Sequence, residues 1–428
     1  MSLPSSSPLP VSKPEGAYRI LHTADWHLGK LLNDRSREEE QTRFLTWLLS
    51  TVKENEVDAI LVAGDIFDTA NPPQSALGIY YNFVSALFRQ GSCSLLIVAG
   101  NHDSAAHLEA PKQVLQALNA HVVGFLAEEP KARILCLPSE DEPKIVIAMM
   151  PFLRDRDLRL GSSGENFEDV RTQLVAGIHQ RYYEAAEAVK ELGAGCPAIA
   201  TGHLTVLGSK TSESERDIHI GGLGAISTDS FPETFGYIAL GHLHRPQTTD
   251  EAGRVRYSGS PIPLSFSEAD DVKEVRILDV NDKSIVQHSL PIPLFRRLAQ
   301  IRTTNAGLEA AMKEFNTQAG ELGTWVEVVV EDATLQDELN ERVRKLAERH
   351  GIDVLKVLRG ASPTFMCMSA EDTTDDEAIE TLLDKPTNVF EHLLKQHPDI
   401  SEEHVGKLRV AFDHLVELET QMESVGAV

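Results

Sequence analysis

The order of apolar and polar stretches along the chain predicts strands that alternate with helices. Residues 18–23 (YRILHT) predict a short strand that ends in a polar loop, and the runs 57–63 and 95–99 are nearly wholly apolar, as expected for strands buried on both faces. Between the first two of these three segments, residues 38–55 carry an apolar stripe at helical spacing, made of Phe44, Leu45, Leu48, Leu49 and Val52. The same alternation continues with a helix over 74–90, strands at 144–149, 198–201 and 237–240, and a long helix over 166–192. Alternating strands and helices predict βαβ units and a layered α/β core, with β-sheets flanked by helices.

The sequence pattern changes near residue 254, beyond which short strand-like stretches follow one another closely. Together with a helix over 334–349, they predict a small α+β capping domain appended to the core. An acidic stretch at 371–377 precedes two amphipathic segments, 387–397 and 401–422, which predict a C-terminal helical tail. We therefore expect a disordered tail at 1–17, the α/β domain at 18–270, the capping domain at 271–360, an acidic linker at 361–386 and the helical tail at 387–428.

Composition and charge restrict the class of protein. The chain has 428 residues, of which 42% are hydrophobic and 25% charged, and this is typical of a folded globular protein. The 40 Lys and Arg against 65 Asp and Glu give a net charge of −25, which argues against a protein that coats polyanions or binds an anionic membrane surface. No apolar run approaches the ~20 residues of a membrane span, and residues 1–16 lack the apolar segment of a signal peptide. Four widely spaced cysteines without a CxxC pair favour a reducing compartment, so we expect a cytoplasmic protein without a membrane partner.

Five polar clusters each follow a predicted strand. They are Asp25-Trp-His27, Gly64-Asp65-Ile-Phe-Asp68, Gly100-Asn101-His102-Asp103, Gly202-His203 and Gly241-His242-Leu-His244. Loops after successive parallel strands gather at the carboxyl edge of a sheet, so residues far apart in the chain should converge. The glycine before four of the clusters lets the backbone turn sharply, so that the next side chain points into the site.

The converging groups are carboxylates, imidazoles and one amide, and they include no thiolate. Mixed oxygen and nitrogen donors suit divalent ions such as Mn²⁺, Fe²⁺ or Zn²⁺. One carboxylate can bridge two metal ions. Two such ions can stabilise both the attacking and the leaving oxygen of an in-line displacement at phosphorus. Taken singly, each cluster has an ordinary explanation as surface polarity, a turn or a satisfied core histidine. All five together, in this order at strand ends, favour a two-metal site.

The order DxH, GDxxD, GNHD, GH, GHxH resembles the calcineurin-like metallophosphoesterases. Longer strings, among them LHTADWHLGK, AGDIFDTANPP, VAGNHDS, PFLRDRD, ATGHLTVLGSK, RDIHIGG, YIALGHLHRPQ and RYSGSPIPLSF, are similar to the SbcD family of nuclease subunits from bacterial SbcCD complexes. The resemblance runs from about residue 18 to 290 and continues more loosely to the C-terminus. It implies a metal-dependent DNA exonuclease and endonuclease, of bacterial and nucleoid-associated type, that acts in DNA repair and recombination.

The resemblance also implies roles for single residues. One ion would be held by Asp25, His27, Asp65 and His244, and the second by Asp65, Asn101, His203 and His242. Asp65 is then the bridge, and Mn²⁺ is the expected metal, with Fe²⁺ and Mg²⁺ as alternatives. His102 would be a catalytic group that contacts the phosphate or protonates the leaving oxygen, Asp103 would orient its imidazole, and Asp68 would support the loop. Water activated between the ions would be the nucleophile, without a covalent protein intermediate.

The expected partners are double- and single-stranded DNA and an SbcC-like ATPase. Basic residues in candidate loops could form a local rim for DNA phosphates, although mixed RDRDLR also fits an ordinary solvated face. These residues are Lys30, Arg35, Arg37, Arg154, Arg156, Arg159, Lys210 and Arg245. The tail helices either pack on each other or dock on the ATPase through apolar faces that include Phe390 and Phe412. A homodimer within a heterotetramer is a further expectation from the family, with 74–90 and 105–118 as its candidate surface.

Two other functions remain open at the level of sequence. The first is a phosphatase or cyclic-nucleotide phosphodiesterase that uses the same metal site on a small substrate. The second is a metal-free binding scaffold on the same fold. The complete set of ligand residues disfavours the scaffold, and the appended domain and tail disfavour the small-substrate enzyme.

Overall fold

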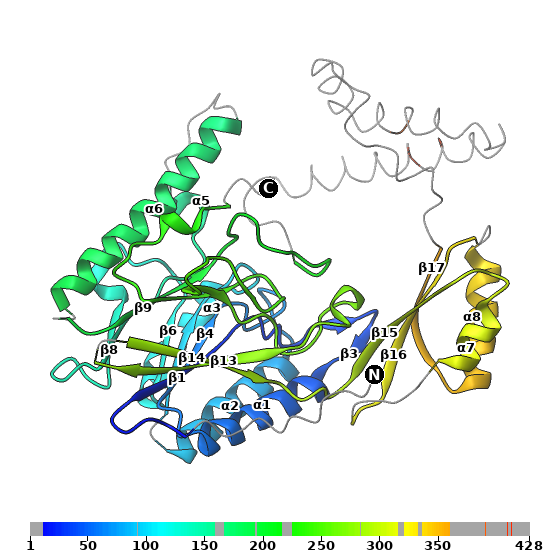
Figure 1. Ribbon diagram of the computed structural model, residues 1–428, viewed down its shortest axis with the longest axis horizontal. Coiled ribbons are helices and arrows are strands. Elements are labelled where there is room, and N and C mark those ends of the chain that lie inside the picture. The colour runs from blue at the N-terminus through cyan, green and yellow to red at the C-terminus, as the bar shows by residue number, and fades with distance from the viewer. Residues whose placement is uncertain are drawn as a thin grey trace. The chain divides into compact units, whose positions relative to one another are not determined.

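The computed structural model describes residues 12–91, 93–158, 167–192, 195–215, 225–282, 284–315, 321–332 and 336–359, and the single residues Phe390, Arg409 and Phe412. Residues 1–360 and 361–428 form two separate units. Within the described part of the first unit, the chain forms two six-stranded sheets and a three-stranded sheet (Figure 1). A short hairpin of β2 (Leu31–Leu32) and β3 (Arg35–Ser36) follows the first strand.

The first sheet has the strand order β14-β13-β1-β4-β5-β6. Its parallel strands are β1 (Tyr18–Thr23), β4 (Ala59–Ala63), β5 (Ser94–Val98) and β6 (Ala120–Val123). Parallel neighbours need crossover connections, which here are α1 (Glu38–Glu54), α2 (Gln74–Gln90) and the short α3 (Ala105–Glu109) and α4 (Lys112–Ala117). The sheet is completed by two antiparallel strands, β13 (Glu274–Asn281) and β14 (Ser284–Pro291).

The second sheet has the order β11-β12-β10-β9-β8-β7. Four parallel strands form its centre, namely β12 (Val255–Tyr257), β10 (Tyr237–Gly241), β9 (Ala198–His203) and β8 (Ile145–Ala148). The antiparallel edges are β11 (Gln247–Thr248) and β7 (Ile134–Leu137). Between β8 and β9 the chain forms α5 (Asp155–Leu158) and α6 (Phe167–Leu192), and single 3₁₀ turns lie at Pro130–Arg133, Thr228–Ser230 and Phe266–Glu268.

The two sheets pack face to face, with helices on their outer faces. Ile20 and Leu61 of the first sheet share one buried cluster with Ile147 and Ile199 of the second. The predicted stripe on α1 packs against the opposite face of the first sheet, while α6 covers the second sheet. Figure 1 shows α1 and α2 on one side of the paired sheets and α6 on the other. The core is therefore layered helix, sheet, sheet, helix, as expected for the predicted α/β class.

The appended module consists of β15 (Arg297–Thr303), α7 (Leu308–Glu314), β16 (Thr324–Val330), α8 (Gln336–His350) and β17 (Asp353–Arg359). Its three strands are parallel, in the order β15-β16-β17, and one helix connects each pair. The module is thus two successive βαβ units and differs from the α+β arrangement that we predicted. The difference arises because β15 and the short α7 carry no strong periodic signal and were not predicted.

The boundary between core and module also differs from the prediction. We expected the capping domain to begin at residue 271, but β13 pairs with β1 over the register Tyr18↔Val280 to His22↔Arg276. Residues 274–291 therefore complete the first core sheet, and the module starts with β15. Strands near a domain boundary carry no sequence signal for the sheet that they join, because either sheet buries the same apolar pattern.

A cluster of charged and aromatic side chains, which we call the clasp, joins the module to the core. Glu40 on α1 accepts hydrogen bonds from Arg37 Nε at 2.8 Å and from Arg296 Nε at 3.0 Å. The Arg296 guanidinium lies 4.1 Å from the ring centroid of Trp325 on β16. Arg37 also donates to the carbonyl oxygen of Pro263 at 2.8 Å. The clasp thus connects the loop after β3, the helix α1 and the module.

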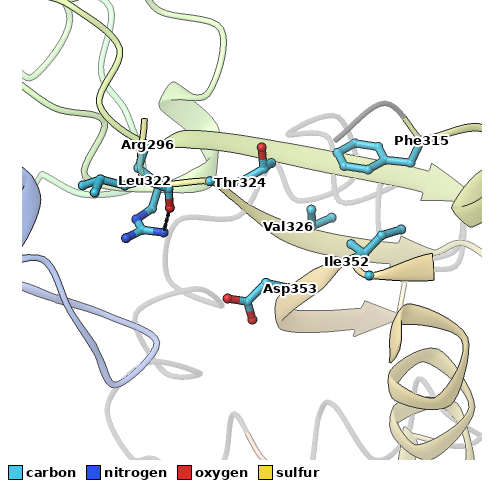
Figure 2. A pocket seen from close by; sticks show the side chains of 9 residues that line it. Arg296, Phe315, Leu322, Thr324, Val326, Ile352 and Asp353 are labelled. Carbon is cyan, nitrogen blue, oxygen red and sulfur yellow. Dashed lines mark hydrogen bonds between the residues drawn. The ribbon is translucent and has the colours of Figure 1, made fainter. Parts of the chain in front are cut away.

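A pocket of about 270 Å³ lies within the module beside the clasp (Figure 2). It is lined by Arg296, Phe315, Leu322, Gly323, Thr324, Val326, Gly351, Ile352 and Asp353. Arg296 donates to the carbonyl oxygen of Leu322 on its rim. The lining carries a single carboxylate and no histidine, so this pocket lacks the donors of a metal site.

Of the predicted linker and tail, only Phe390, Arg409 and Phe412 are among the described residues. The rings of Phe390 and Phe412 stack with centroids 4.1 Å apart and planes 2° apart. Two of the apolar side chains predicted to face a partner therefore contact each other. The N-terminal segment 1–11 lies outside the described residues. Among the helices that the structure describes, none is long and apolar enough to cross a membrane.

Candidate metal centre

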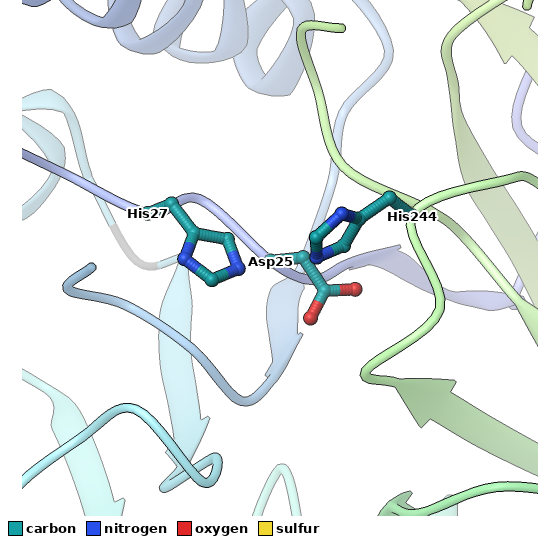
Figure 3. A group of neighbouring side chains, drawn as sticks. All are labelled: Asp25, His27 and His244. Carbon is teal, nitrogen blue, oxygen red and sulfur yellow. The ribbon is translucent and has the colours of Figure 1, made fainter. Parts of the chain in front are cut away.

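The five predicted clusters converge at the carboxyl ends of parallel strands from both sheets. The loops after β1, β4 and β5 come from the first sheet, and His203 at the end of β9 and the loop after β10 come from the second. Figure 3 shows Asp25, His27 and His244 beside one another, two from the loop after β1 and one from the loop after β10. Three overlapping groups have donor atoms within 4.8 Å of one another: Asp25, His27 and His244; His27, Asp65 and His102; and Asp25, Asp65 and His203.

Four of the candidate ligands have a left-handed backbone. The φ angles are 54° at Asp25, 44° at His27, 52° at Asp65 and 95° at His242. Residues other than glycine adopt this region at a cost of about 1–3 kcal/mol each, and they persist where the surrounding structure holds them there. Strain concentrated at four residues of one cluster is an independent sign that the cluster has a function.

Two glycines are required by close packing in the site. At Gly64, where φ is 94°, a Cβ atom would lie 2.2 Å from His203 Nδ1. At Gly100, a Cβ atom would lie 2.1 Å from Asp65 Oδ1, although its backbone is not left-handed. We predicted that these glycines act by turning the backbone. That explanation fits Gly64, whereas Gly100 is needed because the Asp65 carboxylate occupies the space of a side chain.

The imidazoles at the centre are held through their outer nitrogen. His27 Nδ1 lies 3.1 Å from Asp68 Oδ1, and His203 Nδ1 lies 2.9 Å from the carbonyl oxygen of Ala63. His102 Nδ1 lies 2.7 Å from the carbonyl oxygen of Asp68. Because these oxygens only accept hydrogen bonds, each Nδ1 carries the proton and donates it. Each Nε2 is then turned toward the other side of the ring, which is the usual arrangement of histidines that bind metals.

Two buried atoms of the cluster make no hydrogen bond within the described part of the chain. They are Asp25 Oδ2 and His27 Nε2. Asp25 Oδ1 is occupied, since it accepts from the backbone N–H of His242 at 2.9 Å. Buried polar atoms are almost always hydrogen-bonded, so a buried carboxylate oxygen and a buried imidazole nitrogen without a bond require another partner. A divalent cation fits both atoms, because both are electron-pair donors.

Asp65 lies between the two halves of the cluster. Its Oδ2 atom is 3.5 Å from His27 Nε2 and 3.3 Å from His203 Nε2, while Oδ1 accepts from the backbone N–H of His102 at 2.9 Å. One carboxylate oxygen thus faces both imidazoles that the family pattern assigns to different ions. This geometry fits a bridging carboxylate.

The remaining predicted ligands lie beside His203. Asn101 Oδ1 is 2.9 Å from His203 Nε2, and the ring centroid of His242 is 5.4 Å from that of His203. On the other side of Asp65, the His27 ring contacts His244 at 5.0 Å and His102 at 4.7 Å. All seven predicted metal ligands therefore lie in one cluster around Asp65.

The electrostatics of the cluster also favour a bound cation. Burial and the neighbouring Asp65 carboxylate raise the pKa of Asp25 well above its usual range. Burial would lower the pKa of His203, but the carboxylates of Asp65 and Asp25 raise it to about 9. Burial and the charge of His203 hold the pKa of His242 well below its usual range. Without metal, a proton on His203 supplies the positive charge that two buried carboxylates demand.

Asp103 has a different role from the one we predicted. Its carboxylate accepts hydrogen bonds from the backbone N–H groups of Ile66, Phe67 and Gly100, at 3.1, 3.0 and 2.9 Å. It thereby ties the loop after β4 to the loop after β5. The imidazole of His102 is oriented by the carbonyl oxygen of Asp68, and the side chain of the same residue holds His27 and Lys30.

Sequence reasoning missed the residues behind His244. Its Nδ1 atom lies 2.5 Å from Ser214 Oγ and 3.5 Å from the buried Glu268 carboxylate, and its backbone N–H donates to Glu215 at 2.7 Å. Glu268 pairs in turn with the buried Lys273 at 2.6 Å. The string RYSGSPIPLSF ends just before Glu268, but it has no spacing that identifies a partner of a histidine.

The predicted basic rim is reduced by the structure. Arg37 is buried in the clasp and cannot reach DNA, because its guanidinium is bonded to Glu40. Lys30 is paired with Asp68. Arg35 and Arg156 are exposed, and each lies near one carboxylate, 3.7 Å from Asp353 and 4.0 Å from Asp157 respectively. The other predicted residues are Arg154, Lys210 and Arg245, which are partly or largely accessible, and Arg159, which lies outside the described residues.

Comparison with known families agrees with this geometry. The model of the calcineurin-like phosphoesterases matches residues 18–246. A second family model, described as type 5 capsule protein repressor C-terminal domain, matches residues 294–397. Its start agrees with a module that begins after β14.

Curated relatives cover most of the chain. The SbcD subunit of nuclease SbcCD from Escherichia coli (strain K12) is 36% identical over 375 residues, which cover 86% of this chain and 92% of that protein. Proteins of the same name are 39% identical in Rhodobacter capsulatus, covering 66% of this chain and 72% of that protein, and 38% identical in Bacillus subtilis, covering 61% and 66%.

Proposed function

Since this chain belongs to the calcineurin-like phosphoesterase family and, within it, to the SbcD subunits of SbcCD nucleases, we propose that it hydrolyses phosphodiester bonds of DNA with two divalent metal ions. The observation that carries the proposal is the convergence of two unbonded buried atoms, Asp25 Oδ2 and His27 Nε2, beside the shared carboxylate of Asp65. A metal-free scaffold would have no reason to keep such atoms buried.

The residues present fit two ions. One ion would be held by Asp25, His27, Asp65 and His244, and the other by Asp65, Asn101, His203 and His242. The donor set of carboxylate, imidazole and amide without thiolate suits Mn²⁺ better than softer metals, and Fe²⁺ and Mg²⁺ are the alternatives. When bound, the ions supply a water of lowered pKa and positive charge against the phosphoryl oxygens.

The protein side chains orient and exchange protons around that chemistry. His102 keeps its Nδ1 proton on the carbonyl oxygen of Asp68, so a second proton, on Nε2, would be the one that passes to the departing sugar oxygen. Asp103 fixes the loop that presents His102, through its three backbone hydrogen bonds. Asp68 contacts both His27 and His102, and thus fixes the position of a proposed ligand relative to the proposed acid.

We propose that DNA approaches over an exposed basic rim in spite of the net charge of −25. Arg35 and Arg156 have side chains 59% and 67% exposed, and Lys210 is also exposed. Of the −25, residues 371–428 carry −11, from 15 acidic and 4 basic residues, so the catalytic domain is less acidic than the net charge of the whole chain indicates. Phosphate contacts position the duplex without reading its sequence, which suits a nuclease that acts on both double and single strands.

The proposed partner is an SbcC-like ATPase that binds the tail at 387–428, and the whole acts in DNA repair in the bacterial cytoplasm. A homodimer is proposed through α2 and α4, where Tyr81, Phe88 and Val114 are 40%, 46% and 65% exposed. Truncation before Pro386 should leave metal binding and weak Mn²⁺-dependent cleavage by the isolated subunit, and should abolish co-purification with the ATPase. Unchanged complex formation after truncation would contradict the assignment of the tail.

The direct test is cleavage of labelled duplex and single-stranded DNA by the purified chain, with and without the ATPase subunit. We expect cleavage in Mn²⁺, none after chelation, and recovery when Mn²⁺ is restored. Comparison of Mn²⁺, Fe²⁺ and Mg²⁺ at equal concentration tests the metal assignment. Hydrolysis of a plain phosphomonoester without any cleavage of DNA would contradict the proposal and favour a small-substrate phosphatase.

A further inference from the structure

The groups behind His244 form a buried chain of hydrogen bonds that ends in an ion pair. Glu268 is fully buried, and its Oε2 atom lies 2.6 Å from Lys273 Nζ, which is 5% exposed. The same Nζ donates to the carbonyl oxygen of His244 at 2.9 Å and to Ser260 Oγ at 3.1 Å. Lys273 therefore anchors both the carboxylate and the backbone of the histidine.

The direction of the hydrogen bonds in this chain follows from Glu268. A carboxylate only accepts, so the hydroxyl of Ser214 donates to Glu268 Oε1. Its oxygen is then available to accept from His244 Nδ1, 2.5 Å away. The ring proton therefore lies on Nδ1, and the lone pair lies on Nε2, the nitrogen on the opposite side of the ring.

The Nδ1 atoms of His27, His102 and His203 face a carboxylate or backbone carbonyl oxygen, which can only accept a hydrogen bond and therefore fixes the proton on Nδ1. The Nδ1 atom of His244 faces a hydroxyl instead. A hydroxyl can both donate and accept, so Ser214 alone would allow either tautomer of His244. Only the buried carboxylate behind it removes the choice.

Stability alone does not explain this arrangement. Removing a carboxylate and an ammonium from water is unfavourable, and an apolar pair of equal volume is often as stable. We propose that Glu268, neutralised by Lys273, is a positioning residue that fixes the tautomer and orientation of His244 and thereby sets the affinity of the ion bound by Asp25, His27, Asp65 and His244. The inference rests on the proposed two-metal function and adds a residue that the motif pattern does not contain.

Glu268→Gln tests this role, because an amide can donate as well as accept. The amide of the variant can donate to Ser214, whose hydroxyl can then donate to His244 Nδ1 and move the ring proton to Nε2. We expect one of two bound Mn²⁺ ions to lose about 10–100-fold in affinity, the usual effect of removing a group that orients a metal ligand. Isothermal titration of the metal-free full-length chain with Mn²⁺ measures both affinities.

Glu40→Gln is the matched control. Glu40 is also buried and paired with cationic side chains, but it belongs to the clasp and contacts no candidate ligand. The control should lose stability and still bind both ions with wild-type affinity. Equal loss of Mn²⁺ affinity in the two variants would overturn the proposal, since the effect would then come from stability. Wild-type affinities in Glu268→Gln would overturn it as well.

Catalysis gives a second readout that a structural role would not move. With bis(p-nitrophenyl) phosphate as substrate, Glu268→Gln should need about 10–100-fold more Mn²⁺ for half-maximal rate and approach the wild-type rate at saturation. An unchanged Mn²⁺ requirement would contradict the proposal. If Glu268→Gln does not fold, the double variant Glu268→Met with Lys273→Met removes both charges, and retained wild-type affinity there would overturn the inference. If the wild-type chain binds no Mn²⁺, the proposed function itself fails.

Discussion

The metal centre and the clasp are both buried clusters of charged side chains, yet their atoms are used differently. In the clasp, the two carboxylate oxygens of Glu40 accept from Arg37 and Arg296, and none of these three side chains is left with an unbonded buried atom. In the metal centre, Asp25 Oδ2 and His27 Nε2 have no hydrogen bond within the described residues. Both clusters are thus charged and buried, but only the clasp has a hydrogen bond for every buried polar side-chain atom.

Backbone conformation separates the two clusters in the same way. None of the clasp residues has a positive φ, whereas four candidate ligands do. The fold tolerates strain and unbonded atoms where a bound ion would compensate for them, and every hydrogen bond is made where the cluster only joins two parts of the chain. Buried oxygen and nitrogen atoms without a hydrogen bond, together with positive φ angles, therefore distinguish a functional polar cluster from a structural one.

Replacement of Asp65 should have the largest effect in either cluster. Asp65→Ala removes the oxygen that faces both His27 and His203, so neither ion keeps its full ligand set. We expect both ions to be lost and DNA cleavage to fall by more than about 10⁴-fold, because the metal-assisted share of the rate enhancement is removed. Metal content by elemental analysis and single-turnover cleavage measure the two effects. Two retained ions with normal cleavage would remove Asp65 from the bridge.

Replacement of His102 should separate chemistry from metal binding within the metal centre. Because its proposed task is proton transfer, His102→Ala should keep two ions and near-normal DNA affinity and lose about 10²–10⁴-fold in turnover. Elemental analysis beside cleavage on one preparation distinguishes this from unfolding. Loss of one ion would instead make His102 a ligand, which its place in a group with His27 and Asp65 also allows.

Replacement of Glu40 should lower the stability of the chain without changing its metal content, which is the reverse of the effect expected in the metal centre. Glu40→Gln leaves the buried Arg37 and the neighbouring Arg296 without their carboxylate. We expect the free energy of unfolding to fall by about 3–5 kcal/mol, as when one partner of a buried ion pair is removed, with Mn²⁺ content unchanged. Denaturant titration of the metal-free chain measures the loss. A normal stability would show that the clasp does not hold the module to the core.

The sequence carried enough information to predict the candidate metal ligands, because their motifs follow strands and strand ends meet. The buried runs at 57–63 and 95–99 and the stripe from Phe44 to Val52 correspond closely to β4, β5 and α1. The sequence could not show that Asp103 bonds backbone amides, that Arg37 is buried or that Glu268 lies behind His244. Each depends on contacts between segments that only tertiary packing brings together, and a charged residue has the same pattern whether exposed or paired. The strands β13 and β14, at one end of the first sheet, were misplaced for the same reason.

His22 offers the smallest and sharpest test of the comparison, because its Nε2 is also buried without a hydrogen bond. It lies between the two sheets, where Nδ1 is 2.9 Å from Tyr237 Oη and Arg276 is the charged neighbour. Among the described residues, His22 belongs to none of the groups whose donor atoms could share an ion, so its unbonded nitrogen alone should not bind metal. Burial and the charge of Arg276 lower the pKa of His22 to about 3. The folded chain thus resists a proton that the unfolded chain binds below about pH 6.5, and stability falls as the pH drops below that value.

His22→Gln should leave the Mn²⁺ content intact and remove less than about 1 kcal/mol of the acid-induced loss of stability at pH 6. Denaturant titrations of metal-free wild type and variant at pH 8 and pH 6 measure this difference, since the other histidines contribute equally to both. A lost ion would show that an unbonded buried nitrogen is sufficient evidence of a ligand, and an unchanged pH dependence would show that His22 is protonated in the fold.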